Sequence, residues 1–232
     1  MSLPVAVFAS GSGSNLQAIL DHHATLDAPP WRVQLVISDQ EDARALRRAH
    51  RSGIRSRFLP VAGRSSGDVA AETLDILSSA DIGFIALAGY LRLIPADVVE
   101  AFRERMVNIH PALLPAFGGK GMYGMRVHEA VLASGARLTG PTVHFVDEEY
   151  DRGPIVAQWP VSVRAGDDPH ALAARVLRVE HLLYPRVVDH LSRALARGRR
   201  PTPFSPPGTA FLAKSQAGAD VARSISAGFT GD

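Results

Sequence analysis

Short apolar runs alternate along the chain with segments in which apolar residues recur every three or four positions. The first pattern is typical of buried strands and the second of amphipathic helices. Strands are predicted over residues 3–9, 32–38, 58–61, 82–88, 106–110, 142–146 and 154–163. Helices are predicted from about residue 16, over 41–51 and 68–79, from Pro95, and over 126–134. This order predicts an α/β fold: an open, mostly parallel twisted sheet with helices on both faces.

The last predicted helix is the longest. Asp168 is placed to cap it, a proline follows in its first turn, and the amphipathic pattern continues to about residue 196. Pro185 lies inside this helix and is expected to kink or break it. The remainder, residues 201–232, contains four prolines and four glycines and shows no periodicity. We therefore predict a single domain over residues 1–200 and a C-terminal tail or loosely packed extension over residues 201–232.

Composition narrows the class of protein. Hydrophobic residues make up 46% of the 232 residues, which is enough for a sizeable core. The chain has no cysteine, which excludes disulfides, thiolate zinc sites and cysteine nucleophiles and favours a reducing compartment. The net charge is only +2 and aromatic residues make up 6%, so we expect no nucleic-acid partner. No stretch approaches the ~20 consecutive apolar residues that span a bilayer, so we expect a cytoplasmic protein with no membrane partner.

A glycine-rich loop with the sequence SGSGSN, residues 10–15, separates the first predicted strand from the first predicted helix. Backbone N–H groups at a helix N-terminus bind anions, and serine and asparagine side chains add donors. Leu16 stands where the dinucleotide fingerprint has its third glycine, and the loop lacks the lysine of a P-loop. Neither NAD nor a nucleoside triphosphate is therefore indicated. The loop is typical either of a phosphate-monoester site or of a serine-capped turn.

Two polar residues lie at the end of the predicted strand 106–110. Asn108 and His110 are two positions apart, so their side chains leave the same face of that strand. Ligands of open α/β sheets bind at the C-terminal ends of the strands. An asparagine amide can donate to a developing oxyanion, and a histidine can carry a proton near neutral pH. The pair is interpreted either as catalytic or as hydrogen-bonding residues at the end of a strand.

Asp151 lies in an acidic loop, residues 147–153. A carboxylate beside an imidazole raises its pKa, so Asp151 would hold His110 as the acid if the two segments meet; otherwise the loop is an exposed turn. The nine histidines include no HxH pair and no HExxH motif. We therefore predict no metal site.

Five segments carry a family resemblance: ASGSGSNLQA, LAGYLRLI, VNIHPALLP, TVHFV and DRGPI, which begin at residues 9, 87, 107, 142 and 151. The pattern NxHPxLLP is shared by enzymes that use 10-formyltetrahydrofolate, and the GSN loop narrows the resemblance. Over roughly residues 4–190 the chain resembles the phosphoribosylglycinamide formyltransferase family. These are folate-dependent enzymes of de novo purine biosynthesis with a Rossmann-like fold.

The resemblance implies that the chain transfers the formyl group of 10-formyltetrahydrofolate, the cosubstrate, to the amine of 5-phosphoribosylglycinamide, as a monomer or homodimer. It implies four residues that bind the ribonucleotide, through its phosphate and its ribose or glycinamide: Gly13, Ser14, Asn15 and Glu180. It implies five that enclose the folate, four of them through their backbone: Leu91, Arg92, Leu93, Ile94 and Asn108. The implied catalytic residues are Asn108 and a protonated His110, which stabilise a tetrahedral oxyanion, and Asp151, which raises the pKa of His110; His144 supports them.

Other functions are weaker interpretations of the same residues. Methionyl-tRNA formyltransferase carries a large C-terminal RNA-binding barrel, for which the predicted tail is too short. Formyltetrahydrofolate deformylase resembles a longer chain with an N-terminal regulatory domain, whereas the first strand here begins at Leu3. A non-catalytic protein that binds a folate or phosphate ligand is the alternative from another class, and the presence of all three implied catalytic residues speaks against it.

Overall fold

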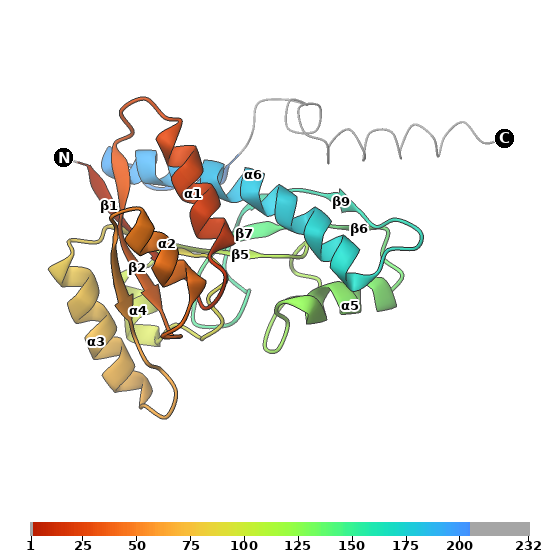
Figure 1. Cartoon of the computed structure of the whole chain (residues 1–232), viewed down its shortest axis with the longest axis horizontal. Coiled ribbons are helices and arrows are strands. Elements are labelled where there is room, and N and C mark those ends of the chain that lie inside the picture. Colours follow the sequence, from red (N-terminus) through yellow and green to blue (C-terminus); the bar gives the residue numbers. More distant parts are fainter. Residues whose placement is uncertain (1, 205–232) are drawn as a thin grey trace.

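The computed structural model describes residues 2–204 of the chain. Within this range the helices are α1 (Ser14–Ala24), α2 (Arg44–Arg51), α3 (Ser66–Ser79), α4 (Ala96–Ala101), α5 (Met125–Ala133) and α6 (Pro169–Ala196). The strands are β1 (Leu3–Phe8), β2 (Trp31–Ser38), β3 (Arg55–Phe58), β4 (Phe84–Leu87), β5 (Met106–His110), β6 (Leu138–Thr139), β7 (Thr142–Phe145), β8 (Ile155–Gln158) and β9 (Val161–Ser162). Figure 1 shows their arrangement.

Seven strands form one sheet in the order β3-β2-β1-β4-β5-β7-β8. The strands from β3 to β5 run parallel, and β7 and β8 extend the sheet in antiparallel pairing. Strand order reverses at β1, because β2 lies on one side of it and β4 on the other. Such a switch point opens a crevice at the C-terminal ends of the strands. The predicted α/β fold with a mostly parallel sheet is confirmed.

Alternating side chains of the strands feed two separate cores, one on each face of the sheet. In β1, Val5 and Val7 pack in the core beneath α1, α2 and α6, whereas Ala6 and Phe8 pack in the core beneath α3 and α4. All four side chains are at most 1% exposed. The continuous apolar run of this strand therefore reflects burial on both faces, as the sequence pattern predicts.

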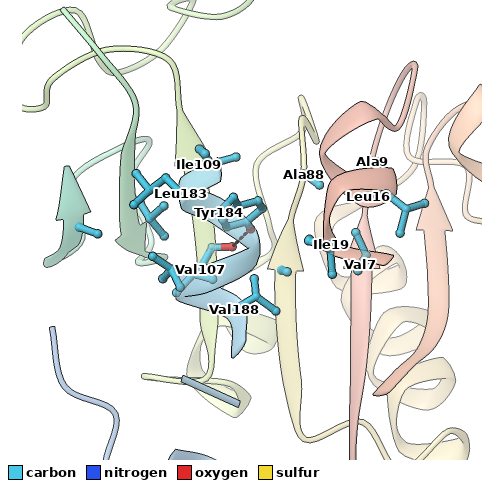
Figure 2. Close-up of a cluster of buried hydrophobic side chains, with 14 of the residues drawn as sticks. Val7, Ala9, Leu16, Ile19, Ala88, Val107, Ile109, Leu183, Tyr184 and Val188 are labelled. Atoms are coloured by element: carbon cyan, nitrogen blue, oxygen red, sulfur yellow. Dashed lines mark hydrogen bonds between the residues drawn. The ribbon is translucent and has the colours of Figure 1, made fainter. Parts of the chain in front are cut away.

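Tyr184 of α6 ties the long helix to the centre of the sheet (Figure 2). Its hydroxyl lies 2.8 Å from the carbonyl oxygen of Leu87 in β4 and 3.2 Å from that of Val107 in β5. The ring is fully buried, and these contacts satisfy its polar atom. Glu180 lies one helical turn before Tyr184, so the same anchor fixes Glu180 at the carboxyl ends of the parallel strands.

Three expectations about individual elements are wrong. The third strand was expected over residues 58–61 but is Arg55–Phe58, a charged and largely exposed edge strand that no apolar run marks. The single strand expected over residues 154–163 is two strands, because β8 ends the large sheet while β9 pairs with β6 in a separate two-stranded sheet. Pro185 does not break α6, which is continuous from Pro169 to Ala196.

Packing explains why α6 tolerates its internal proline. Leu183 and Tyr184 before Pro185, and Val187 and Val188 after it, are all fully buried against the sheet. Burial of apolar side chains on both sides of the proline offsets the lost backbone hydrogen bond. The helix is therefore held by tertiary contacts that its own sequence does not reveal.

The predicted tail over residues 201–232 lies almost entirely outside the described residues. Within the described part, the backbone N–H of Phe204 donates to the carbonyl oxygen of Val156 in the edge strand β8 at 2.9 Å. The ring of Phe204 packs edge-on against His190 of α6. The chain after α6 thus returns along the edge of the sheet as far as residue 204.

Candidate active site

A cavity of about 630 Å³ lies at the C-terminal ends of β1, β4 and β5. The glycine-rich loop after β1 contributes Ser12 and Asn15, and the segment after β4 contributes Gly89, Tyr90 and Leu91. The other walls come from the end of β5, the loop before α5, α5 itself, the acidic loop and α6. The cavity therefore occupies the crevice at the switch point of the sheet, where ligands bind in folds of this kind.

Four polar side chains from three segments converge at one side of this cavity. Asn108 and His110 end β5, and His144 of β7 lies directly opposite Asn108 in the antiparallel ladder. Asp151 joins them from the acidic loop. Its Oδ2 lies 3.4 Å from Nδ1 of His110, and its Oδ1 lies 3.4 Å from Nε2 of His144 and 3.5 Å from Nδ2 of Asn108. The two segments that the sequence left separate therefore meet.

Backbone geometry brings the acidic loop onto the sheet. Asp151 has a left-handed backbone with φ of 58°, which is uncommon for a residue with a side chain. Gly153 follows so closely beneath β7 that a methyl group on it would collide with the carbonyl oxygen of Phe145. The backbone N–H of Gly119 then donates to Oδ2 of Asp151 at 2.9 Å. The carboxylate is thus fixed from the loop before α5 as well as by the histidines.

His110 is 3% exposed and has an acceptor at each ring nitrogen. Its Nε2 lies 2.8 Å from the carbonyl oxygen of Phe117, so this nitrogen carries a proton, and Nδ1 faces Asp151. Burial lowers the pKa of His110, whereas Asp151 and the Phe117 carbonyl raise it, and the net direction is downward. Asp151 acts on the pKa in the expected direction, but burial outweighs it.

The same contacts hold Asp151 ionised. Burial raises the pKa of its carboxyl group, but the adjacent His144 and His110 side chains and the Gly119 N–H outweigh burial and lower it. His144 donates from Nδ1 to the carbonyl oxygen of Phe145 at 2.8 Å, which leaves its Nε2 directed at Asp151 and Asn108. The cluster combines an amide donor, a carboxylate and an imidazole that gains an ion pair when it takes up a proton. Such a set can stabilise a developing negative charge and move a proton.

At the opposite side of the cavity, the glycine-rich loop meets α6. Gly13 has φ of 68°, and a methyl group on it would lie 2.8 Å from Cα of Ala45, so this position requires glycine. Helix α1 begins at Ser14, one position after this turn, and its first N–H groups have no partners within the helix. Asn15 donates from Nδ2 to Oε2 of Glu180 at 2.7 Å. Ser14 faces a separate hollow along α1 and α6.

Glu180 is 8% exposed, and Asn15 is the partner of its carboxyl group. Burial raises the pKa of Glu180 by more than the Asn15 hydrogen bond lowers it. Oδ1 of Asn15 is buried without a partner, although both residues line the cavity. Burial thus shifts Glu180 towards its neutral form, the direction opposite to Asp151.

The segment expected to enclose the folate is only partly at the cavity. Of its four residues, Leu91 lines the wall, Ile94 is buried in the core, and Leu93 is 46% exposed. The side chain of Arg92 turns away and donates from Nε to Oδ2 of Asp39 at 2.9 Å. The backbone N–H of Leu91 donates to Oγ of Ser10 at 2.9 Å, which joins the segment to the glycine-rich loop.

Several groups at the cavity escaped sequence reasoning. The Phe117 carbonyl and the Gly119 N–H belong to the irregular loop before α5, and the contacts of backbone groups leave no signal in the sequence. His128 of α5 also lines the cavity and is 5% exposed. Its sequence pattern is that of a helix face, so no local feature separates it from an ordinary core residue. Among residues 2–204, no cluster of three or more metal-ligating side chains is present and no helix is long and apolar enough to cross a membrane.

Comparison with known proteins agrees with this architecture. The formyl transferase family model matches residues 3–188. The chain belongs to the formyl transferase family. A chloroplastic phosphoribosylglycinamide formyltransferase of Arabidopsis thaliana is 50% identical over 187 residues, which cover 79% of this chain and 63% of the relative. The human trifunctional purine biosynthetic protein adenosine-3 is 36% identical over 80% of this chain, but the match covers only 18% of that protein.

Solved structures extend the likeness to three dimensions. Glycinamide ribonucleotide transformylase 1 of Symbiobacterium toebii superposes with a TM-score of 0.76 at 39% identity, over 85% of this chain and 89% of that one. The sequence match covers 63% of the Arabidopsis thaliana protein and 60% of the chloroplastic phosphoribosylglycinamide formyltransferase of Vigna unguiculata. The chain therefore spans less than two thirds of the length of these two relatives. The family and fold are thus shown, and the activity is argued below from the site.

Proposed function

We propose that the protein transfers the formyl group of 10-formyltetrahydrofolate to the glycinamide amine of 5-phosphoribosylglycinamide. The products are formylglycinamide ribonucleotide and tetrahydrofolate. One observation carries this proposal: Asn108, His110 and Asp151 meet at a cavity that also reaches the glycine-rich loop. Membership in the formyl transferase family and the printed names of the relatives support the choice of reaction.

The two sides of the cavity suit two different substrates. We assign the phosphate of the ribonucleotide to Gly13, Ser14 and Asn15, where unpaired N–H groups open α1. We assign Glu180, which is bonded to Asn15, to a sugar hydroxyl or the glycinamide. We assign the folate to the backbone of the segment from Leu91 to Ile94, together with Asn108. Leu91 and Tyr90 line that wall.

The proposed reaction is a direct transfer. The lone pair of the amine forms a bond to the formyl carbon, and the carbonyl electrons move onto oxygen as a tetrahedral intermediate forms. Asn108 donates from Nδ2 to this oxyanion. The Nε2–H group of His110, which donates to the Phe117 carbonyl oxygen in the free protein, donates to the oxyanion instead. The bond from carbon to N10 then breaks, and the proton lost by the amine moves to N10 with the help of His110.

Asp151 stabilises the imidazolium form of His110 during this transfer. Its carboxylate lies 3.4 Å from Nδ1 and is held ionised by its other partners. Asp151 raises the pKa of His110 against the effect of burial, so the ion pair favours the protonated imidazole that donates to the oxyanion. His144 supports this arrangement by orienting the other carboxylate oxygen.

The test is to mix the purified protein with 10-formyltetrahydrofolate and to follow the deformylated folate by absorbance, with and without 5-phosphoribosylglycinamide. Release that requires the ribonucleotide and yields its formylated product is the expected result. Release without the ribonucleotide would identify a deformylase instead. Binding of a folate analogue without release in either case would identify a non-catalytic binding protein.

The proposed partners are these two small molecules. A monomer or homodimer and a cytoplasmic location stay predictions, since the plant relatives are named as chloroplastic. The absence of a nucleic-acid partner also stays a prediction.

A further inference from the structure

A third histidine borders the cavity without belonging to the Asp151 cluster. His128 lies in α5, is 5% exposed and lines the cavity wall. Its Nδ1 is shut off from solvent and has no hydrogen-bond partner in the described chain. Nε2 also makes no hydrogen bond to described residues but is not enclosed in this way, which leaves it as the nitrogen open to the cavity.

The lack of partners is unusual for a buried histidine in this site. His110 and His144 each contact an acceptor at both ring nitrogens. A buried polar group without a partner destabilises the folded protein, whereas an apolar side chain of similar shape fills the same space without that cost. The imidazole of His128 is therefore poorly explained by packing, and a ligand in the cavity would supply the missing partner.

The position of α5 indicates which ligand this is. Helix α5 packs on α6 (Figure 1), and α6 gives the cavity Ala173, Ala174, Leu177 and Glu180. Glu180 is bonded to Asn15 of the glycine-rich loop. Helix α5 therefore packs against the helix that reaches the loop assigned to the phosphate.

We propose that His128 binds the phosphoribosyl substrate, with Nε2 hydrogen-bonded to its sugar or glycinamide part. The inference rests on the proposed function and adds a residue that the family motifs quoted above do not contain. Burial lowers the pKa of His128, and the charge of His110 lowers it further. Both effects favour the neutral imidazole, which suits a hydroxyl or amide group.

The test compares substitutions of His128 by calorimetry, separately from turnover. His128→Phe keeps a flat ring without nitrogen, His128→Met is a second apolar replacement, and His128→Gln places an amide near the position of Nε2. The ligands are 5-phosphoribosylglycinamide, ribose 5-phosphate and a 10-formyl folate analogue that does not react. His170→Phe, at an exposed position on the same chain, is the control for the substitution itself.

We expect both apolar variants to weaken ribonucleotide binding about tenfold, the loss of one neutral hydrogen bond in a buried site, with folate-analogue binding unchanged. His128→Gln should recover most of the affinity, and the Tm of His128→Phe should equal or exceed that of the wild type. Weaker binding of ribose 5-phosphate as well would place the contact on the sugar. An unchanged ribose 5-phosphate affinity would place it on the glycinamide.

Wild-type affinity for the ribonucleotide in His128→Phe and His128→Met would overturn this inference alone. Equal losses in the Phe, Met and Gln variants, or weakening of the folate analogue instead, would also overturn it, because each indicates packing or the other wall. If the wild-type protein itself does not bind the ribonucleotide, the proposed function and this inference fail together.

Discussion

Two carboxyl groups that line the same cavity have pKa values shifted in opposite directions. Asp151 and Glu180 are both largely buried, and burial raises the pKa of each. Asp151 is nevertheless held ionised by two histidines and a backbone N–H, and its pKa is lowered. Glu180 has a single amide partner, so burial prevails and its pKa is raised.

The difference shows that the hydrogen-bonding and charged partners of a carboxyl group decide whether burial prevails in shifting its pKa. On the Asp151 side, the proposed catalytic side, the contacts favour a negative charge. On the Glu180 side, the proposed ribonucleotide side, burial favours the neutral form, which reduces repulsion with a bound phosphate. The two sides of the cavity therefore shift their carboxyl groups in opposite directions.

The largest effect is expected on the catalytic side from Asn108→Ala. Removal of one donor to an oxyanion typically reduces kcat by about 10²–10³-fold. The KM of the ribonucleotide should change little, because Asn108 is far from the glycine-rich loop in the proposed binding mode. Steady-state kinetics with both substrates varied gives the two constants, and near-normal turnover would remove the centre of the mechanism.

Asp151→Asn should reduce activity most at alkaline pH. Asp151 raises the pKa of His110, so its loss lowers that pKa further. Above the pKa, each unit of decrease reduces the imidazolium fraction about tenfold. The alkaline limb of the kcat profile should therefore move to lower pH. Glu149→Gln, in the exposed part of the same loop, is the control, and a profile with an unmoved alkaline limb would contradict the pairing.

Gly118→Ala tests whether the loop before α5 positions the catalytic carboxylate. A methyl group there would collide with Cδ2 of Leu114 and lie 3.2 Å from Cβ of Asp151, so Asp151 must shift by a few tenths of an ångström. We expect a several-fold loss of kcat with little change in the affinity for the ribonucleotide. This loss corresponds to an increase of about 1 kcal/mol in the activation free energy, caused by misplacement of the carboxylate. Gly67→Ala, which meets only Oγ of Ser65 at 4.0 Å, is the matched control. Equal kcat in the two variants would exclude a positioning role.

The smallest kinetic effect is expected from Glu180→Gln, because burial favours the neutral form of the carboxyl group and glutamine keeps its shape without the charge. The KM of the ribonucleotide should rise by no more than about threefold, within the range of one neutral hydrogen bond. A large loss of affinity that depends on pH would mean that Glu180 acts as a carboxylate, and the division between the two sides would fail.

The same variants should differ in how stability depends on pH. The pKa of Glu180 is raised in the folded protein above its ordinary value of 4.5. The stabilising contribution of Glu180 is therefore fully present below pH 4.5 and is lost as the pH rises. Glu180→Gln should therefore gain Tm relative to the wild type as pH increases from about 4.5. Asp151 has a lowered pKa, so its contribution is present above its ordinary value of 3.8 and is lost on acidification. Parallel Tm-against-pH curves for the two variants would contradict the comparison.

Much of the fold follows from local sequence. The apolar runs of β1, β2, β4 and β5 mark strands buried on both faces, and the structure places all four strands in the centre of the sheet. The glycine-rich loop and the Asn108–His110 pair were found because each lies within a few residues at the end of a predicted strand. The edge strand β3 escaped prediction, since an exposed strand of charged residues has no apolar pattern.

The sequence by itself determined the class of fold, the glycine-rich loop as a candidate anion site and the residues that resemble a known family. Only the tertiary structure decided that Asp151 meets His110, that the Phe117 carbonyl occupies its other nitrogen, and that His128 faces the cavity. The physical reason is distance along the chain. The alternation of side chains along a strand places residues two positions apart on one face, so it can be read from the local sequence. The contacts of Asp151 and His128 depend instead on the left-handed backbone of Asp151 and on the packing of α5 against α6.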